Sequence, residues 1–309
     1  MDTIIAENIV RLHGTGRGIE GMSLSVGAGQ CLGILGANGS GKTTLTRLVA
    51  GLDRADRGRL FVLGGPAYPR ARQLRHRCGV ALDTPAHWDS LSGRQNLWFF
   101  ARQYGLTGSA LSRRVDELLC QADLTAQADD PVAAYSFGMR RKLSIIEALP
   151  HDPDLLILDE PSANVDEAFL ERLVQWVRQR CECGKTTWVA DNDADWISRT
   201  ATHAILLSNG RILAEGEVPE LMASIGARNR IDILLEQSGF GSRPKIDGVE
   251  AFHCDRNRIT AELRGSPETP VELVRWITSR GGRVRSMEVR SMTLYEALMR
   301  RTTQQENKQ

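Results

Sequence analysis

The stretch Gly36-Ala-Asn-Gly-Ser-Gly-Lys42-Thr43 combines glycines, a lysine and a hydroxyl at a spacing suited to phosphate binding. It matches G-x-x-x-x-G-K-[ST] at every fixed position, follows a buried-strand pattern at 31–35 and opens a helical pattern at 44–50. Glycines let backbone N–H groups surround phosphate oxygens, and the helix N-terminus adds its positive dipole end. The residues expected to bind a nucleoside triphosphate are Gly36, Asn38, Gly39, Ser40, Gly41, Lys42, Thr43 and Thr44.

A second apolar run, at 155–158, ends in the two acids Asp159 and Glu160. In phosphate-loop proteins a carboxylate at such a strand end completes the shell of a Mg²⁺ ion, whose other protein ligand is the loop hydroxyl, here Thr43. The next carboxylate, Glu160, is placed to polarise a water for attack on the phosphate. These acids therefore predict Mg²⁺-dependent hydrolysis, with Thr43 and Asp159 as metal ligands.

Three alternating aspartates in Trp188-Val-Ala-Asp-Asn-Asp-Ala-Asp-Trp196 raise the question of a further metal site. A calcium loop starting at Asp191 needs Gly at its sixth position and Glu at its twelfth, where this chain has Trp196 and Thr202. We therefore interpret the aspartates as the polar end of a buried strand.

Between the glycine-rich stretch at 36–43 and the strand that ends in Asp159 and Glu160 lies Tyr135-Ser-Phe-Gly-Met139, followed by a helix with cations at its start. In this order the motifs resemble the ATP-binding cassette (ABC) ATPases, whose signature is Leu-Ser-Gly-Gly-Gln. Ser136 and Gly138 match the signature, whereas Tyr135, Phe137 and Met139 depart from it. Residues 161–166 are similar to the family's D-loop, with its aspartate present as Asp166. The resemblance covers residues 1 to about 222.

The resemblance implies ATP and Mg²⁺ as cofactors and a second cassette as partner. In the family, two cassettes enclose each ATP between the phosphate loop of one subunit and the signature serine of the other. Ser136, Gly138 and Asp166 are thus expected to face the partner's nucleotide. The sequence leaves open whether the pair is a homodimer or a heterodimer.

Three positions depart from the family's pattern. Asn192 aligns with the switch histidine that contacts the γ-phosphate, Asp83 with the Q-loop glutamine that senses Mg²⁺ and the attacking water, and His13 with the aromatic that stacks on adenine. An acid can still bind water or metal, so Asp83 is expected as a further metal ligand beside Thr43 and Asp159. Unlike a histidine, the Asn192 amide carries no positive charge and cannot exchange a proton, so we predict slow but real ATPase activity. The acid at the Q-loop position and the partial match to the signature resemble those of the drug-resistance and lipid exporters of the ABC-2 type.

Composition excludes several other classes. With 309 residues, 41% hydrophobic and 25% charged, the chain is typical of soluble globular proteins, and a net charge of +1 gives no reason to expect nucleic acid as a partner. The uncharged run at 21–41 holds seven glycines and is not a membrane helix. The acidic N-terminus is not a signal peptide. These features predict a cytoplasmic protein, peripheral on the inner or plasma membrane.

The pattern of elements predicts an α/β fold with a parallel core sheet, antiparallel β additions and a helical insertion at about 84–150. The resemblance implies that residues 1–224 form an ABC nucleotide-binding domain of the P-loop NTPase class, in which the antiparallel strands are a β subdomain. A β-β-β-α-β-α order then predicts a small α+β accessory domain over 225–309. Its last helix resembles the closing helix of accessory domains on exporter ATPases, which implies a regulatory or dimer-holding role, with a passive extension as the alternative.

The leading functional prediction is an ATPase subunit that powers an exporter through a separate integral membrane permease. The loop at 83–89 and the helical insertion are the expected docking surface, and its candidate anchors, which have the subdomain core as their alternative, are Trp88, Trp98, Phe99 and Phe100. One alternative is an ATP-dependent dimerising gate with little hydrolysis. Another is a soluble cassette of DNA repair or translation, which the near-neutral charge disfavours.

Overall fold

The computed structural model describes residues 2–14, 17–69, 72–225, 228–236, 244–264 and 268–306. The chain divides into two compact units: Met1–Val218 with Leu298–Gln309, and Pro219–Ala297. This division falls a few residues before the predicted domain boundary at 224/225, which stays a prediction.

A six-stranded sheet forms the centre of the first unit, in the order β10-β9-β3-β8-β7-β6. Strands β3 (Cys31–Leu35), β7 (Leu155–Asp159) and β8 (Thr186–Ala190) are buried at every residue, as expected of parallel strands covered on both faces. Strand β6 (Cys78–Ala81) extends the parallel part, while β9 (His203–Ser208) pairs in parallel with β3 and antiparallel with β10 (Arg211–Glu217). The predicted α/β class is confirmed.

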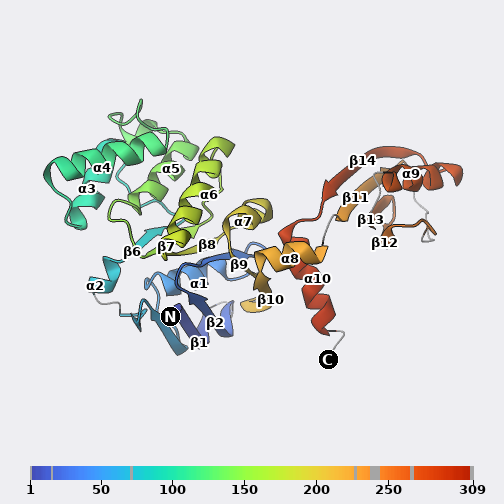
Figure 1. Ribbon diagram of the computed structural model, residues 1–309, viewed down its shortest axis with the longest axis horizontal. Coiled ribbons are helices and arrows are strands. Elements are labelled where there is room, and N and C mark those ends of the chain that lie inside the picture. The colour runs from blue at the N-terminus through green and yellow to red at the C-terminus, as the bar shows by residue number, and fades with distance from the viewer. Residues whose placement is uncertain are drawn as a thin grey trace. The chain divides into compact units, whose positions relative to one another are not determined.

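Helices cover both faces of this sheet (Figure 1). Helix α1 (Lys42–Val49) lies on one side, and α5 (Phe137–Glu147), α6 (Glu167–Glu182) and α7 (Ala194–Thr200) lie on the other. Side chains of α1 pack in one core with the indole of Trp188, whose Nε1 donates to Thr46 Oγ1 at 3.1 Å. The core thus fixes the helix that follows the phosphate loop.

An antiparallel sheet, β2-β1-β4-β5, packs against the same core. Its strands are β1 (Asp2–Leu12), β2 (Gly18–Gly27), β4 (Arg57–Val62) and β5 (Gly65–Pro66). The short helix α2 (Arg72–Arg75) precedes β6. The pairing of β1 with β2 is antiparallel, as expected of the antiparallel β subdomain.

The helical insertion contains α3 (Gly93–Gln103), α4 (Gly108–Gln121), the 3₁₀ turn η1 (Val132–Ala134) and α5. Ser92 and Gln95 form a reciprocal capping box that fixes where α3 begins. Leu97, Val115, Leu118 and Ile146 are fully buried, because α3, α4 and α5 pack on one another.

The second unit is a sheet in the order β12-β13-β11-β14, antiparallel throughout. Its strands are β11 (Arg228–Leu235), β12 (Val249–Asp255), β13 (Arg258–Arg264) and β14 (Val284–Ser291). Helix α9 (Thr269–Ser279) buries Leu273 and Ile277 against one face of this sheet. Helices α8 (Val218–Ile225) and α10 (Leu294–Glu306) precede and follow these elements in the chain.

Candidate nucleotide-binding site

The phosphate loop connects the end of β3 to the start of α1, and three glycines shape it. Gly39 and Gly41 have φ angles of +81° and +110°, which L side chains rarely adopt. At Gly36 an added Cβ would lie 2.3 Å from the Leu207 carbonyl oxygen, so only glycine fits there. The loop is therefore a backbone cradle whose N–H groups are free of side-chain crowding, as anion binding requires.

Lys42 lies inside this loop and is buried. Its Nζ donates to the carbonyl oxygen of Gly36 at 2.7 Å and to Asn192 Oδ1 at 2.8 Å. Burial lowers the pKa of Lys42, and the neighbouring carboxylates of Glu160 and Asp159 oppose that shift. The ammonium group is thus held at the centre of an acidic site, from which it can reach an incoming phosphate.

Asp159 ends β7 with a side chain that is fully buried. Neither carboxylate oxygen has a hydrogen-bond partner within the described residues. Burial raises the pKa of Asp159 to about 6, and the neighbouring hydroxyl of Thr43 opposes that rise. A buried carboxylate without a partner beside a hydroxyl is a donor set that suits a hard divalent cation. Mg²⁺ therefore fits this site, where Thr43 and Asp159 would hold it.

Asn192 connects the phosphate loop to Glu160, the acid that follows β7. Its Nδ2 donates to Asn38 Oδ1 at 3.0 Å and lies 3.4 Å from Glu160 Oε1. Glu160 has a φ angle of +52°, and its backbone N–H donates to the Ala190 carbonyl oxygen at 2.7 Å. The structure therefore brings together three predicted site residues, Lys42, Glu160 and Asn192, which come from three separate segments.

The aspartates that follow β8 have structural partners. Asp191 accepts hydrogen bonds from the backbone and hydroxyl of Ser162 at 2.9 and 2.7 Å, and from the backbone N–H of Asn192 at 2.7 Å. Asp193 caps α7 by accepting from the N–H groups of Asp195 and Trp196. These bonds tie the segment carrying Asn192 to the chain that follows Glu160, and they give both carboxylates a role that requires no metal.

Arg141 is a residue of this site that sequence reasoning missed. It lies on α5 and is buried, with Nη1 donating to the Leu82 carbonyl oxygen at 2.6 Å and Nη2 donating to the Asp159 carbonyl oxygen. Burial lowers the pKa of Arg141, and four acids oppose the shift, namely Asp159, Asp191, Asp83 and Glu160. Together with the ammonium group of Lys42, the guanidinium thus supplies positive charge to the acid cluster. In the sequence it is one of three successive cations, Arg140, Arg141 and Lys142, and nothing there indicates that Arg141 is the one directed to the end of β7.

The other two departures from the family pattern lie at the edges of the site. His13 is exposed, and its Nε2 lies 3.2 Å from Thr44 Oγ1 in the first turn of α1. Asp83 follows β6 and accepts a hydrogen bond from the backbone N–H of Thr84 at 2.7 Å. The structure therefore places an imidazole beside the phosphate loop and a carboxylate near Asp159 and Arg141.

The residues that resemble the family's signature lie at the start of α5. Ser136 caps α5 by accepting from the Met139 N–H at 3.2 Å, and Phe137 beside it is 72% exposed. Asp166 caps α6 and forms an ion pair with Lys142. Among the described residues, no hydrogen bond or ion pair joins Ser136 or Asp166 to the phosphate loop of the same chain. Gly138 has no room for a side chain, because a Cβ would lie 2.5 Å from the Asn164 carbonyl oxygen.

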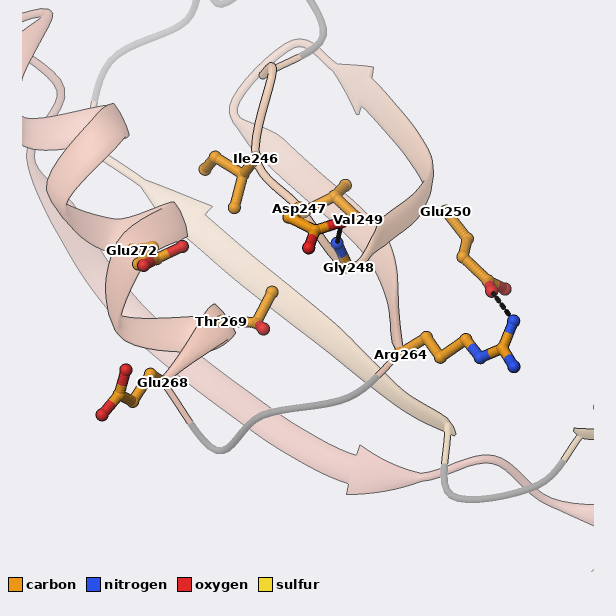
Figure 2. Close-up of a pocket in the computed structure, with 9 residues that line it drawn as sticks. All are labelled: Ile246, Asp247, Gly248, Val249, Glu250, Arg264, Glu268, Thr269 and Glu272. Atoms are coloured by element: carbon orange, nitrogen blue, oxygen red, sulfur yellow. Dashed lines mark hydrogen bonds and ion pairs between the residues drawn. The ribbon is translucent and has the colours of Figure 1, made fainter.

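Two cavities differ in their suitability for nucleotide. One of about 350 Å³ is lined by Ala37–Ser40 of the phosphate loop together with Arg17 and Asn209. Another, of about 650 Å³, lies in the second unit, where Figure 2 shows four carboxylates around it and Arg264 directed to Glu250, 3.7 Å away. An acidic lining repels phosphate. Of these two cavities, the one at the phosphate loop is therefore the candidate nucleotide site.

Comparisons with known proteins agree with this geometry. The family profile described as "ABC transporter" matches residues 19–163. A Nod factor export ATP-binding protein I from Burkholderia orbicola is 32% identical over 271 residues, which are 84% of this chain and 89% of the relative. The daunorubicin resistance ATP-binding protein DrrA3 from Streptomyces coeruleorubidus is 31% identical over 303 residues, 97% of this chain and 95% of the relative. A solved ATP-binding subunit of an ABC transporter shares the fold, with a TM-score of 0.66 and 23% identity over 72% of this chain and 93% of that structure.

The parallel sheet, the glycine loop and the acids at the end of β7 define a P-loop nucleoside triphosphatase. Within that class, the chain belongs to the ATP-binding cassette (ABC) transporter family and is one of its ATPases.

Proposed function

We propose that this chain binds and hydrolyses ATP to power export through a separate membrane-spanning subunit, with hydrolysis slowed at Asn192. The observation that supports this most directly is the contact of Asn192 with Lys42 and Glu160, which places an uncharged amide between the phosphate loop and the proposed base. The relatives named for Nod factor export and daunorubicin resistance support the direction of transport.

Each residue of the nucleotide site has a separate role in this proposal. Backbone N–H groups of 36–41 and the ammonium group of Lys42 bind the β- and γ-phosphates. Glu160 orients a water and accepts its proton as the oxygen attacks the γ-phosphorus, and the bond from that phosphorus to the bridging oxygen breaks to release ADP. Thr43 and Asp159, with Asp83 nearby, would hold Mg²⁺, which would neutralise charge at the phosphates. His13 contributes a ring against the adenine.

In this proposal Asn192 slows the step of hydrolysis in which negative charge develops at the γ-phosphate. Its Nδ2 can donate one hydrogen bond to a γ-phosphate oxygen, but the amide carries no positive charge and has no proton to share. Loss of one well-placed donor or cation in an anionic transition state typically costs ~10²–10³ in rate. Since Lys42, Thr43, Asp159 and Glu160 are all in place, we expect hydrolysis to be slow rather than absent.

The partners proposed are an integral membrane permease and a second cassette. Among the described residues, no helix has the length and apolar character needed to cross a membrane. Trp88 is 43% exposed and Phe99 40% exposed, and their rings meet at 4.4 Å between centroids, with Phe100 joining the cluster. An exposed aromatic cluster is typical of a docking anchor, so we propose that the permease contacts the insertion here. The chain would then act on the cytoplasmic face of the membrane.

The test is Mg²⁺-dependent ATP hydrolysis by the purified chain, with Glu160→Gln and Asn192→His as variants. We expect a low rate in the wild type, loss of that rate in Glu160→Gln and an increase of ~10-fold or more in Asn192→His. Asp195→Asn is the matched control, because this exposed residue lies on the same segment outside the Lys42–Asn192–Glu160 contacts. An unchanged rate in Asn192→His contradicts the weakened switch.

A second candidate function has its own support. Asn192 gives the site hydrogen bonds without charge, which suits ATP binding more than turnover. A chain that binds ATP, shows no turnover above the Glu160→Gln background and still dimerises would be an ATP-dependent gate instead.

A further inference from the structure

A single histidine turns inward from the exposed loop that follows β6. Residues 83–90 of this loop are all exposed except His87, whose side chain is only 3% exposed. Its Nδ1 lies 3.7 Å from Oε2 of Glu147, the last residue of α5, whose side chain is 5% exposed. The structure therefore buries an imidazole and a carboxylate side by side, and the two groups come from different elements.

This pair lacks the hydrogen bonds that buried polar groups normally form. Nδ1 of His87 and Oε1 of Glu147 have no hydrogen-bond partner within the described residues. Burial raises the pKa of Glu147, and His87 opposes that rise as the one charged group that acts on it in the described part of the chain. The burial of this carboxylate is therefore compensated by the imidazole only while the ring carries a proton.

The other charged groups around this pair have partners elsewhere or are exposed. Helices α3 and α4 pack against α5, and so does β6, which has no charged side chain. The cations that these helices hold inside the domain are bonded as follows: Arg94 to Asp116 and Asp129, Arg114 to the Leu149 and Pro150 carbonyl oxygens, Arg141 to the Leu82 and Asp159 carbonyl oxygens, and Lys142 to Asp166. On the loop itself, Asp83 and Asp89 are exposed.

The loop has few other attachments before Trp88. The side-chain amide of Asn96 accepts from the Trp88 N–H at 2.8 Å and donates to its carbonyl oxygen at 3.0 Å. That carbonyl oxygen also accepts from the Leu91 N–H at 3.2 Å. Among the described residues, no hydrogen bond joins 83–87 to another segment. The burial of His87 is thus the polar contact that holds this stretch against the domain.

We propose that the His87–Glu147 pair is a pH-sensitive contact that holds the loop, and with it the ring of Trp88, against the end of α5. An imidazole ordinarily changes charge between about pH 5 and 8. At the lower pH an imidazolium faces the carboxylate, whereas at the higher pH a neutral ring leaves the carboxylate buried without a counter-charge. Opening of the loop exposes the carboxylate to water, so opening becomes more favourable as pH rises. The consequence for a permease rests on the proposed function, because Trp88 belongs to the proposed docking cluster.

Hydrogen exchange of the full chain tests this contact without nucleotide or permease. The amides of Trp88 and Leu91 report loop opening, because both are hydrogen-bonded within or next to the loop. Expressed as protection factors, which remove the intrinsic pH dependence of exchange, their protection should fall ~10-fold between about pH 5.5 and 7.5. Protection that does not change with pH would overturn the proposal.

Glu147→Gln keeps the shape of the side chain and removes its charge, so the pH dependence at the loop should disappear. His203→Gln is the matched control, because His203 lies 3.6 Å from Glu217 in a pair whose side chains are 33% and 57% exposed. This control should leave the pH dependence at the loop unchanged.

A double variant, His87→Leu with Glu147→Leu, covers the case in which one altered partner disturbs folding. Apolar side chains can replace a buried ion pair without loss of stability, so the loop should be equally protected at both pH values. A pH dependence that persists in Glu147→Gln or in the double variant, or that is lost in His203→Gln, would overturn the proposal. The rate of ATP hydrolysis decides only the proposed function and not this contact.

Discussion

At the scale of single residues, Asp159 gives the site a pH dependence whose sign follows from its environment. Its pKa rises from an ordinary 3.8 to about 6 because burial disfavours the charged carboxylate. Between these two values the folded chain binds more protons than the unfolded chain, so this residue lowers the free energy of unfolding as pH increases. The penalty is absent below pH 3.8 and complete above about pH 6.

Asp159→Asn removes that penalty, and we expect the variant to have a higher Tm than the wild type at pH 8 and a smaller advantage at pH 4.5, where only part of the penalty is present. A shift of this size corresponds to about 3 kcal/mol at most. The measurement is thermal unfolding of both chains across this pH range without nucleotide, with Asp195→Asn as the control. A wild type that is more stable than Asp159→Asn at pH 8 would contradict the prediction. The variant should also lose Mg²⁺-dependent ATPase activity.

At the scale of elements, Arg141 connects three of them. Its guanidinium joins α5 to the chain leaving β6, through the Leu82 carbonyl oxygen, and to the end of β7, through the Asp159 carbonyl oxygen. Arg141→Gln removes one buried cation from beside four acids and leaves them with the ammonium group of Lys42, so we expect a loss of about 3–5 kcal/mol in the free energy of unfolding and reduced ATPase activity. Arg140→Gln is the control, because Arg140 has one exposed bond, to the Ala133 carbonyl oxygen. Similar losses in both variants would show that Arg141 has no special role.

These elements also show what the sequence could predict. The apolar runs at β3, β7 and β8 and the glycine loop have strong local signals, because buried parallel strands and phosphate loops are each encoded within a few residues. Arg141 has no such signal, since its acidic neighbours come from segments far from it in the chain. The contacts of Asn192 with Lys42 and Asn38 are equally non-local, and alignment with the family predicted only the position of the residue, not its partners.

At the scale of the whole molecule, the site is incomplete in one chain under the proposed function. Ser136 and Asp166 begin α5 and α6, and we propose that they meet the nucleotide of a second cassette. In a Glu160→Gln background, which should retain ATP, we expect the chain to dimerise when ATP is added. Light scattering after gel filtration measures this.

Ser136→Asp separates the two roles of Ser136 in the same assay. Aspartate caps a helix as well as serine does, so α5 and the Tm should be preserved, but its charge would face the partner's phosphates. We expect ATP-dependent dimerisation to be lost in Ser136→Asp and retained in Ser136→Asn, which caps without charge. Dimers of equal amount in both variants would contradict the proposed interface.

The crowding at Gly138 has a consequence for how variation in this chain should be interpreted. A side chain at 138 would collide with the Asn164 carbonyl oxygen, whereas Phe137, one residue earlier, projects into solvent and tolerates a large ring. Position 138 is therefore restricted to glycine by packing alone, even in a descendant that had lost catalysis. Sequence variation at position 137 and a retained glycine at position 138 would both follow from packing within one chain. Neither would show whether the protein still hydrolyses ATP.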